Sequence, residues 1–171
     1  DTPVSIYAAT KRYNELLAHA YHHLYDLHLT GLRFFTVYGP WGRPDMALFK
    51  FTKNILEGKP IDVYNHGKMK RDFTYISDIV SGVLAALDKS YPLEIFNLGN
   101  GNPVELNEFI EAIEQAIGKK AIRNEMPMQP GDVPVTFAEI YKAKRLLRYR
   151  PAVSVEEGVK EFFGWYRSYF E

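Results

Sequence analysis

A tyrosine and a lysine four residues apart are the first residues of this sequence that could do chemistry. In the segment Tyr7-Ala8-Ala9-Thr10-Lys11 the phenol and the ammonium lie at positions i and i+4, which share one face of a helix. A cation beside a phenol favours the phenolate, so such a pair could act as an acid–base group near neutral pH. Helices also carry such pairs by chance, and the pattern alone leaves a solvated surface pair open.

Two arginines lie where anions could bind. Arg43 belongs to the loop Gly39-Pro40-Trp41-Gly42-Arg43-Pro44, and its guanidinium fork suits a planar carboxylate. Arg71 lies in a candidate strand just before a candidate helix, which is a suitable place for a phosphate. The alternatives are a solvated loop cation at Arg43 and an ordinary ion pair between Arg71 and Asp72.

Hydrophobic periodicity predicts the elements that position these residues. Apolar side chains at helical spacing predict a helix over 7–30, and an aromatic and β-branched run predicts a buried strand over 32–38. Glycine and proline end that strand. The further predictions are a helix over 46–56, a hairpin of strands 61–64 and 71–75 around 65–68, a helix over 79–87 capped by Ser77 and Asp78, and a strand over 94–98.

The last third of the chain predicts two more helices. One covers 107–117, with an apolar buried face and an acidic solvated face, and ends at Gly118. The other begins at Ser154, where Ser154 and Glu157 have the spacing of a capping box. Strands that alternate with helices predict a single α/β unit over residues 1–171.

Composition limits the classes of partner. Lys and Arg total 21 and Asp and Glu total 21, so the net charge is zero and no nucleic-acid partner is expected. No apolar run approaches the roughly 20 residues of a membrane span, so no membrane partner is expected. The lack of cysteine fits a reducing compartment, and we expect a cytoplasmic protein. The histidines over 19–28 have no carboxylate or thiol at ligand spacing, so no metal site is expected.

Taken together, the Tyr-x-x-x-Lys helix, the strand Leu32-Arg33-Phe34-Phe35-Thr36-Val37-Tyr38 and the loop after it resemble the extended short-chain dehydrogenase/reductase family, specifically the UDP-glucuronate 4-epimerases. The resemblance covers essentially all 171 residues. It implies the C-terminal part of such an enzyme: the end of a Rossmann-type sheet plus a small substrate-binding α/β region, without the N-terminal NAD-binding half. It also implies a homodimer when the protein is intact.

The resemblance assigns a role to each matching residue. Tyr7 would be the acid–base group at the sugar hydroxyl, and Lys11 would hold the NAD ribose and favour the phenolate. The other implied contacts are nicotinamide at Phe34 and Phe35, the sugar carboxylate at Thr36 and Arg43, the UDP diphosphate at Arg71, ribose at Asp132 in the loop 128–134, and uracil at Val63 and Tyr64. Core packing would explain Val63 and Tyr64 equally well, and a turn without a ligand would explain Asp132.

The family's glycine-rich NAD loop is missing. No G-x-G-x-x-G occurs in the sequence, and the turn Gly99-Asn100-Gly101 is assigned no cofactor role. We therefore expect NAD-dependent epimerisation at C4 of a UDP-sugar, UDP-glucuronate above all, to belong to the intact protein. Three alternatives stay open: a UDP-glucuronate decarboxylase, a UDP-glucose 4-epimerase, and an inert nucleotide-sugar-binding or dimerisation module.

Overall fold

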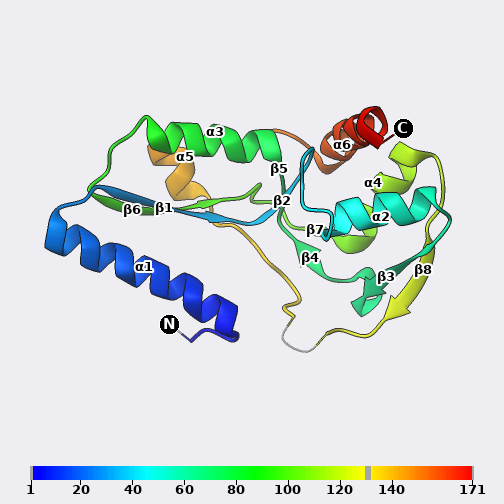
Figure 1. The fold of residues 1–171 in the computed structure, drawn as a ribbon, viewed down its shortest axis with the longest axis horizontal. Helices are drawn as coiled ribbons and strands as arrows, with labels where there is room; N and C mark the ends of the chain where they lie inside the picture. The colour runs from blue at the N-terminus through cyan, green and yellow to red at the C-terminus, as the bar shows by residue number, and fades with distance from the viewer. Residues whose placement is uncertain (1, 130–131, 171) are drawn as a thin grey trace.

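The chain folds as an α/β unit in a computed structural model that describes residues 2–129 and 132–170 (Figure 1). Its elements are α1 (Ile6–Tyr25), β1 (Leu29–Phe34), β2 (Thr36–Tyr38), α2 (Ala47–Leu56), β3 (Pro60–Tyr64), η1 (Asn65–Gly67), β4 (Lys70–Arg71), β5 (Phe73–Tyr75), α3 (Ile76–Leu87), β6 (Leu93–Leu98), β7 (Val104–Glu105), α4 (Leu106–Ile117), β8 (Ile122–Met126), α5 (Tyr141–Leu147) and α6 (Val155–Phe170). The alternation of helices and strands confirms the predicted fold class.

One end of the molecule is a parallel pair of strands covered by helices. Strands β1 and β6 pair from Leu29 opposite Leu93 to Phe34 opposite Leu98. Figure 1 shows α1 on one side of this pair, with α3 and α5 on the other. Beneath α3 and α5 lies a buried cluster that includes Phe96, Leu98 and Tyr149.

The other end has a larger core. Strands β3 and β8 pair in parallel; α2 packs against β3, α4 packs against α2, and α6 packs against α4 (Figure 1). Its buried cluster includes Ile61, Phe109 and Phe162. Between the two ends, β2 pairs in parallel with β5 and β4 pairs antiparallel with β7. This middle segment carries Thr36 and Arg71, the predicted anion-binding residues.

The predicted strand 32–38 divides at Phe35, because the chain changes partners there. The Phe35 N–H donates to the Leu98 carbonyl at 3.2 Å, whereas the Thr36 N–H donates to the Asp72 carbonyl at 3.1 Å. The strand therefore leaves β6 and joins β5 within one residue. This change places Thr36 at the junction of the two ends of the fold.

The predicted hairpin over 61–75 is wrong. Strand β3 pairs with β8, while β4 and β5 pair with β7 and β2. Between them, Asn65, His66 and Gly67 all have positive φ, at 50°, 52° and 71°. The chain turns at these residues without pairing β3 with β4 or β5, and each of the three strands pairs with a strand that is distant in sequence.

The sequence predicted the ends of some helices correctly and the ends of others wrongly. At α6 the Glu157 N–H donates to Ser154 Oγ and the Ser154 N–H to Glu157 Oε2, both at 3.2 Å, which confirms the capping box. Helix α4 ends at Gly118 as predicted, with φ of 76°. The first helix is shorter than predicted because Asp26, with φ of 52°, ends α1 at Tyr25.

Two predictions about polar residues are wrong. Asp78 does not cap α3; it lies inside the first turn, 7% exposed, and accepts the Ala152 and Val153 N–H groups at 3.1 Å. The acidic face of α4 is not wholly solvated, since Glu114 is 5% exposed and accepts the Ala121 N–H at 3.0 Å. In both cases distant or following backbone donors satisfy a buried carboxylate.

Candidate active site

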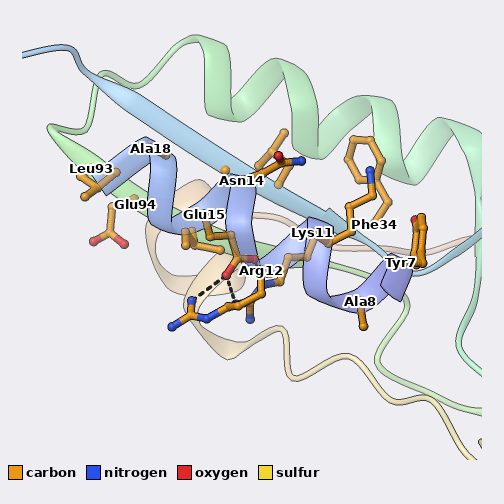
Figure 2. Close-up of a pocket in the computed structure, with 14 residues that line it drawn as sticks. Tyr7, Ala8, Lys11, Arg12, Asn14, Glu15, Ala18, Phe34, Leu93 and Glu94 are labelled. Carbon is orange, nitrogen blue, oxygen red and sulfur yellow. Dashed lines mark hydrogen bonds and ion pairs between the residues drawn. The ribbon is translucent and has the colours of Figure 1, made fainter. Parts of the chain in front are cut away.

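Tyr7 and Lys11 share one face of the first turns of α1, as the i, i+4 spacing predicts. Ser5 caps this helix by accepting the Ala8 N–H on Oγ at 3.1 Å, and Lys11 Nζ lies 5.3 Å from the centroid of the Tyr7 ring. Both side chains border a hollow of about 660 Å³ between α1 and the β1–β6 pair (Figure 2). The Tyr7 phenol is 71% exposed and free to meet a ligand there.

An ion pair at the same hollow fixes α1 against the sheet. Arg33 on β1 donates from Nε and Nη2 to the two Glu15 carboxylate oxygens at 2.6 and 2.7 Å. The Arg33 guanidinium lowers the pKa of Glu15 to about 2, with a further contribution from Arg12. This bidentate contact joins the helix that carries Tyr7 to the strand that leads to Thr36.

Phe34 and Phe35 lie on opposite sides of the chain. Phe34 borders the hollow with Tyr7 and Lys11 and is 52% exposed. Phe35 instead packs against the buried cluster beneath α3. Adjacent strand residues point in opposite directions, so the structure brings Phe34 to this hollow and leaves Phe35 behind it.

A second hollow, of about 460 Å³, lies between α2, β3 and β4. Thr36, Tyr64 and Arg71 border it, so three of the residues predicted to bind substrate come together from β2, β3 and β4. Val63 does not join them, because it is 0% exposed within the larger core. Its predicted contact with uracil is therefore replaced by core packing, whereas Tyr64 lines the hollow.

Arg71 is held in a defined direction at the edge of this second hollow. Its Nη2 donates to Asp132 Oδ1 at 2.6 Å, and its Nη1 donates to the carbonyl oxygens of Val133 at 2.8 Å and Lys70 at 3.0 Å. The Arg71 and Asp132 side chains are 17% and 28% exposed. Arg71 therefore pairs with Asp132 and not with Asp72; Pro130 and Gly131 of the same predicted loop lie outside the described residues.

Asp72 has a structural task that the sequence did not reveal. It is fully buried, and its carboxylate accepts the N–H groups of Asn100 at 2.7 Å, Gly101 at 3.0 Å and Ala138 at 2.9 Å. The Thr74 hydroxyl donates to the same carboxylate at 3.2 Å. Asp72 thus ties the strand that carries Arg71 to two distant segments, and no local pattern indicates this.

Arg43 and Thr36 border one small cavity of about 50 Å³. The Arg43 guanidinium forms a fork to Asp45, with Nε 3.0 Å from Oδ1 and Nη2 2.5 Å from Oδ2. This contact raises the pKa of Arg43 and lowers that of Asp45. Arg43 is therefore a loop cation with a carboxylate partner, in a geometry that a ligand carboxylate could share.

Sequence reasoning missed two polar residues of the second hollow. Lys50 and Asn54 border it from α2, beside Asp45 at the start of that helix. The i, i+4 spacing of Lys50 and Asn54 was a signal in the sequence for one shared helix face.

Among the described residues, no group of three or more His, Cys, Asp or Glu side chains could hold a metal ion. Two of the histidines in the first helix region contact other parts of the chain: His22 Nδ1 lies 2.8 Å from the Leu27 carbonyl oxygen, and His28 Nδ1 lies 2.7 Å from Ser90 Oγ. No helix in the described part of the chain has the length and apolar character needed to cross a membrane.

The fold and the site define a class of protein. An α/β fold with a Tyr-x-x-x-Lys pair on α1 beside one hollow, and with Thr36 and Arg71, which are predicted to bind anions, beside another, fits a sugar-nucleotide oxidoreductase or epimerase. The sequence profile of the NAD dependent epimerase/dehydratase family matches residues 1–99. The chain belongs to that family.

Known relatives refine this assignment. The chain is 60% identical to the uncharacterized protein MJ1055 of Methanocaldococcus jannaschii, over 97% of the chain and 51% of the relative. It is 51% identical to a UDP-glucuronate 4-epimerase of Thermodesulfobacterium geofontis, over 100% of the chain and 53% of the relative. The chain thus spans about half the length of the curated relatives it matches.

Solved structures share the fold. A Bacillus cereus UDP-glucuronic acid 4-epimerase in complex with UDP-glucuronic acid and NAD has a TM-score of 0.92 and 37% identity, over 99% of the chain and 55% of the relative. A Thermotoga maritima UDP-glucose 4-epimerase with UDP-glucose has a TM-score of 0.93 and 30% identity, over 99% of the chain and 56% of the relative. Because both shapes match equally well, the fold does not decide the sugar.

Proposed function

We propose that the intact protein epimerises UDP-glucuronate at C4 with NAD as cofactor. The observation that carries the sugar assignment is the shared cavity of Thr36 and Arg43, a hydroxyl and a guanidinium fork beside the hollow that contains Arg71. A uronate differs from a neutral hexose by one carboxylate, and this pair offers the donors that a carboxylate requires. The identity to UDP-glucuronate 4-epimerases supports the same substrate.

The residues at the first hollow fit a dinucleotide. Lys11 offers ammonium donors to a ribose hydroxyl, Tyr7 an exposed phenol, and Phe34 a flat apolar wall. NAD, when bound, would supply the acceptor for the C4 hydride. The part of this chain is proton transfer: Tyr7 would take the hydroxyl proton, and the Lys11 ammonium lies 5.3 Å from the centre of its ring.

The UDP end of the substrate would lie in the second hollow. Arg71, already directed by Asp132 and two carbonyl groups, would bind the diphosphate, and Asp132 would meet the ribose. Tyr64 would flank the uracil. Val63 is buried in the core, so it would support the site by packing and would not touch the base. Phe35 faces the core, so it would not touch the ligand and would act only by packing behind Phe34.

Control of the carboxylate would decide between epimerase and decarboxylase. A 4-keto uronate is a β-keto acid, which loses CO₂ most easily when its carboxylate bond stands perpendicular to the carbonyl plane. Thr36 and Arg43 would hold the carboxylate away from that orientation. UDP-glucuronate decarboxylase is therefore the second candidate function, because it shares the first step and differs in this restraint.

We further propose that residues 1–171 are the C-terminal, substrate-binding part of a protein whose other half binds the dinucleotide. The lack of G-x-G-x-x-G in the sequence and the coverage of about half of each relative support this arrangement. The intact protein would be a homodimer, which light scattering would test.

The test of the function is an assay of the intact protein with UDP-glucuronate and NAD⁺, followed by identification of the product sugar. UDP-galacturonate is the expected product. A UDP-pentose with release of CO₂ would establish the decarboxylase, and turnover of UDP-glucose alone would reduce the assignment to a neutral hexose. Binding of UDP-glucuronate without turnover by the intact protein would favour an inert module.

A further inference from the structure

An aromatic contact joins the loop that carries Arg43 to the last helix of the chain. The Trp41 ring centroid lies 5.3 Å from that of Trp165 and 5.0 Å from that of Tyr169, and the two α6 rings stack on each other at 5.6 Å. Trp41 is nevertheless 73% exposed, and its φ of 61° is left-handed. An exposed tryptophan in a strained backbone conformation requires a reason.

The two ends of the loop are attached to the neighbouring elements, and its middle carries Trp41 and Arg43. Two backbone hydrogen bonds lie within the loop, from the Gly42 N–H to the Gly39 carbonyl at 3.2 Å and from the Met46 N–H to the Arg43 carbonyl at 3.1 Å, and the Lys50 N–H of α2 donates to the Met46 carbonyl at its end. The Arg43 side chain likewise pairs with Asp45, two residues along. Gly39, at the base of the loop, lies close against Tyr75 of β5 and Ile76 of α3, whereas Trp41 joins the exposed part of the loop to α6.

Helix α6 holds the chain on both sides of the loop as well. Before it, the buried Tyr38 hydroxyl donates to the Ser154 carbonyl at 3.2 Å, and Gly158 leaves the space that this phenol occupies. After it, the Phe49 ring lies 5.3 Å from the ring of Tyr166. Helix α6 therefore contacts the chain before, within and after the loop, and Trp41 supplies the exposed middle contact.

We propose that Trp41 is a positioning residue for carboxylate recognition: by contacting Trp165 and Tyr169 on α6, it holds the loop Gly39–Met46 so that Arg43 stays beside Thr36. This inference rests on the proposed function, because it gives Arg43 the carboxylate. The Arg43 guanidinium pairs with Asp45 of the same loop, so its place depends on the loop. A loop that moves would loosen the restraint on the carboxylate and spare the rest of the site.

The test compares variants of the intact protein. The measurements are kcat/KM for UDP-glucuronate and for UDP-glucose, and the fraction of UDP-pentose formed. We expect Trp41→Ala to lower the glucuronate-to-glucose preference by about tenfold and to raise the pentose fraction, with a melting temperature close to that of the wild type because the side chain is exposed. Trp41→Phe should retain most of the preference, since a ring remains.

Partner and control variants separate positioning from a local surface effect. Tyr169→Ala should shift the preference in the same direction, and the double variant should add little to Trp41→Ala, because both remove one contact. Tyr141→Ala is the matched control, since Tyr141 is 69% exposed on α5 and outside this cluster. An unchanged preference in Trp41→Ala, or fully additive effects, would overturn the proposal.

A second measurement keeps the inference separate from the proposed function. Hydrogen exchange of the Gly42, Arg43, Asp45 and Met46 amides should be faster in Trp41→Ala than in the wild type and unchanged in Tyr141→Ala. If the intact wild type does not turn over UDP-glucuronate, the proposed function fails. Faster exchange in Trp41→Ala would still show that Trp41 holds the loop. If the wild type turns over UDP-glucuronate and exchange in Trp41→Ala is unchanged, the positioning role of Trp41 is wrong and the proposed function stands.

Discussion

Arg71 and Asp132, 61 residues apart in sequence, form an ion pair in which Nη2 lies 2.6 Å from Oδ1. The pair stands at the edge of the hollow that Thr36 and Tyr64 also border. It holds a cation ready for an anionic ligand while a carboxylate neutralises it. A diphosphate that binds Arg71 must therefore share the guanidinium with Asp132.

The first prediction concerns this arginine. Arg71→Ala should weaken the binding of UDP and of every UDP-sugar alike, by roughly tenfold to a hundredfold, because a charge-assisted contact to the diphosphate does not depend on the sugar. Calorimetry with UDP on the intact protein measures it. Lys70→Ala is the control, since exposed Lys70 pairs with Glu105 at 3.4 Å. Equal UDP affinity in Arg71→Ala and wild type would make Arg71 purely structural.

The second prediction concerns Tyr7. Tyr7→Phe in the intact protein should abolish turnover and leave the dissociation constant for UDP-glucuronate nearly unchanged, because only the hydroxyl that moves the proton is lost. Tyr13→Phe removes a hydroxyl from the same helix at a residue that does not border the hollow. Turnover at the wild-type rate in Tyr7→Phe would exclude the phenol as the acid–base group.

Sequence signals predicted the parts of the fold whose causes are local. The capping box of Ser154 and Glu157 and the glycine end of α4 each depend on a few neighbouring residues, and both formed. The hairpin failed because β3 pairs with β8, about sixty residues further along, and no local pattern encodes a distant partner. The Asp72 carboxylate was missed for the same reason, since its donors at 100, 101 and 138 are remote in sequence.

The site residues were predicted one by one from the family resemblance. Strand alternation explains why some of them line a hollow and others face the core. Phe34 with Phe35 and Val63 with Tyr64 are neighbours on extended chain, so one member of each pair must face the core. Phe34 and Tyr64 face the hollows, while Phe35 and Val63 face inward. The alternation of side chains along an extended strand could have predicted from the sequence that only one member of each pair faces a hollow.

The third prediction tests the role of Asp72 in stability. Asp72→Ala should lower the free energy of unfolding by roughly 2–4 kcal/mol, because it leaves three backbone N–H groups without their acceptor in a buried site. Urea unfolding of the intact protein measures the change. Asp62→Ala is the control for loss of a carboxylate, since Asp62 is exposed on β3. A difference below about 1 kcal/mol between the two variants would contradict the prediction.

The fourth prediction is a pH dependence at Glu15. Because Arg33 lowers the folded-state pKa of this carboxyl from 4.5 to about 2, its stabilising contribution is present above pH 4.5 and is lost as the pH falls toward 2. The difference in unfolding free energy between wild type and Glu15→Gln should therefore be largest above pH 4.5 and shrink toward zero near pH 2. Urea titrations at several pH values measure it, with exposed Glu111→Gln as the control. A difference that is constant with pH would exclude the linkage.

The last prediction separates the glucuronate assignment from a general epimerase. Arg43→Ala in the intact protein should lower kcat/KM for UDP-glucuronate by roughly tenfold to a hundredfold, because a charge-assisted contact to the sugar carboxylate disappears. UDP-glucose has no carboxylate, so its kcat/KM should not fall, and the affinity for UDP should not change. Steady-state kinetics with both sugars, together with detection of any UDP-pentose, measures these effects.

Two further variants identify the cause of the change at Arg43. Arg43→Lys keeps the charge and loses the fork, so it should recover only part of the preference for UDP-glucuronate. Asp45→Asn releases Arg43 from its present partner, whose oxygens lie at 3.0 and 2.5 Å, and should preserve or raise that preference if a ligand carboxylate competes with Asp45 for the guanidinium. If Arg43→Ala leaves the ratio of the two sugars unchanged, the guanidinium does not recognise the carboxylate. The substrate then becomes a UDP-hexose whose C6 group this loop does not select.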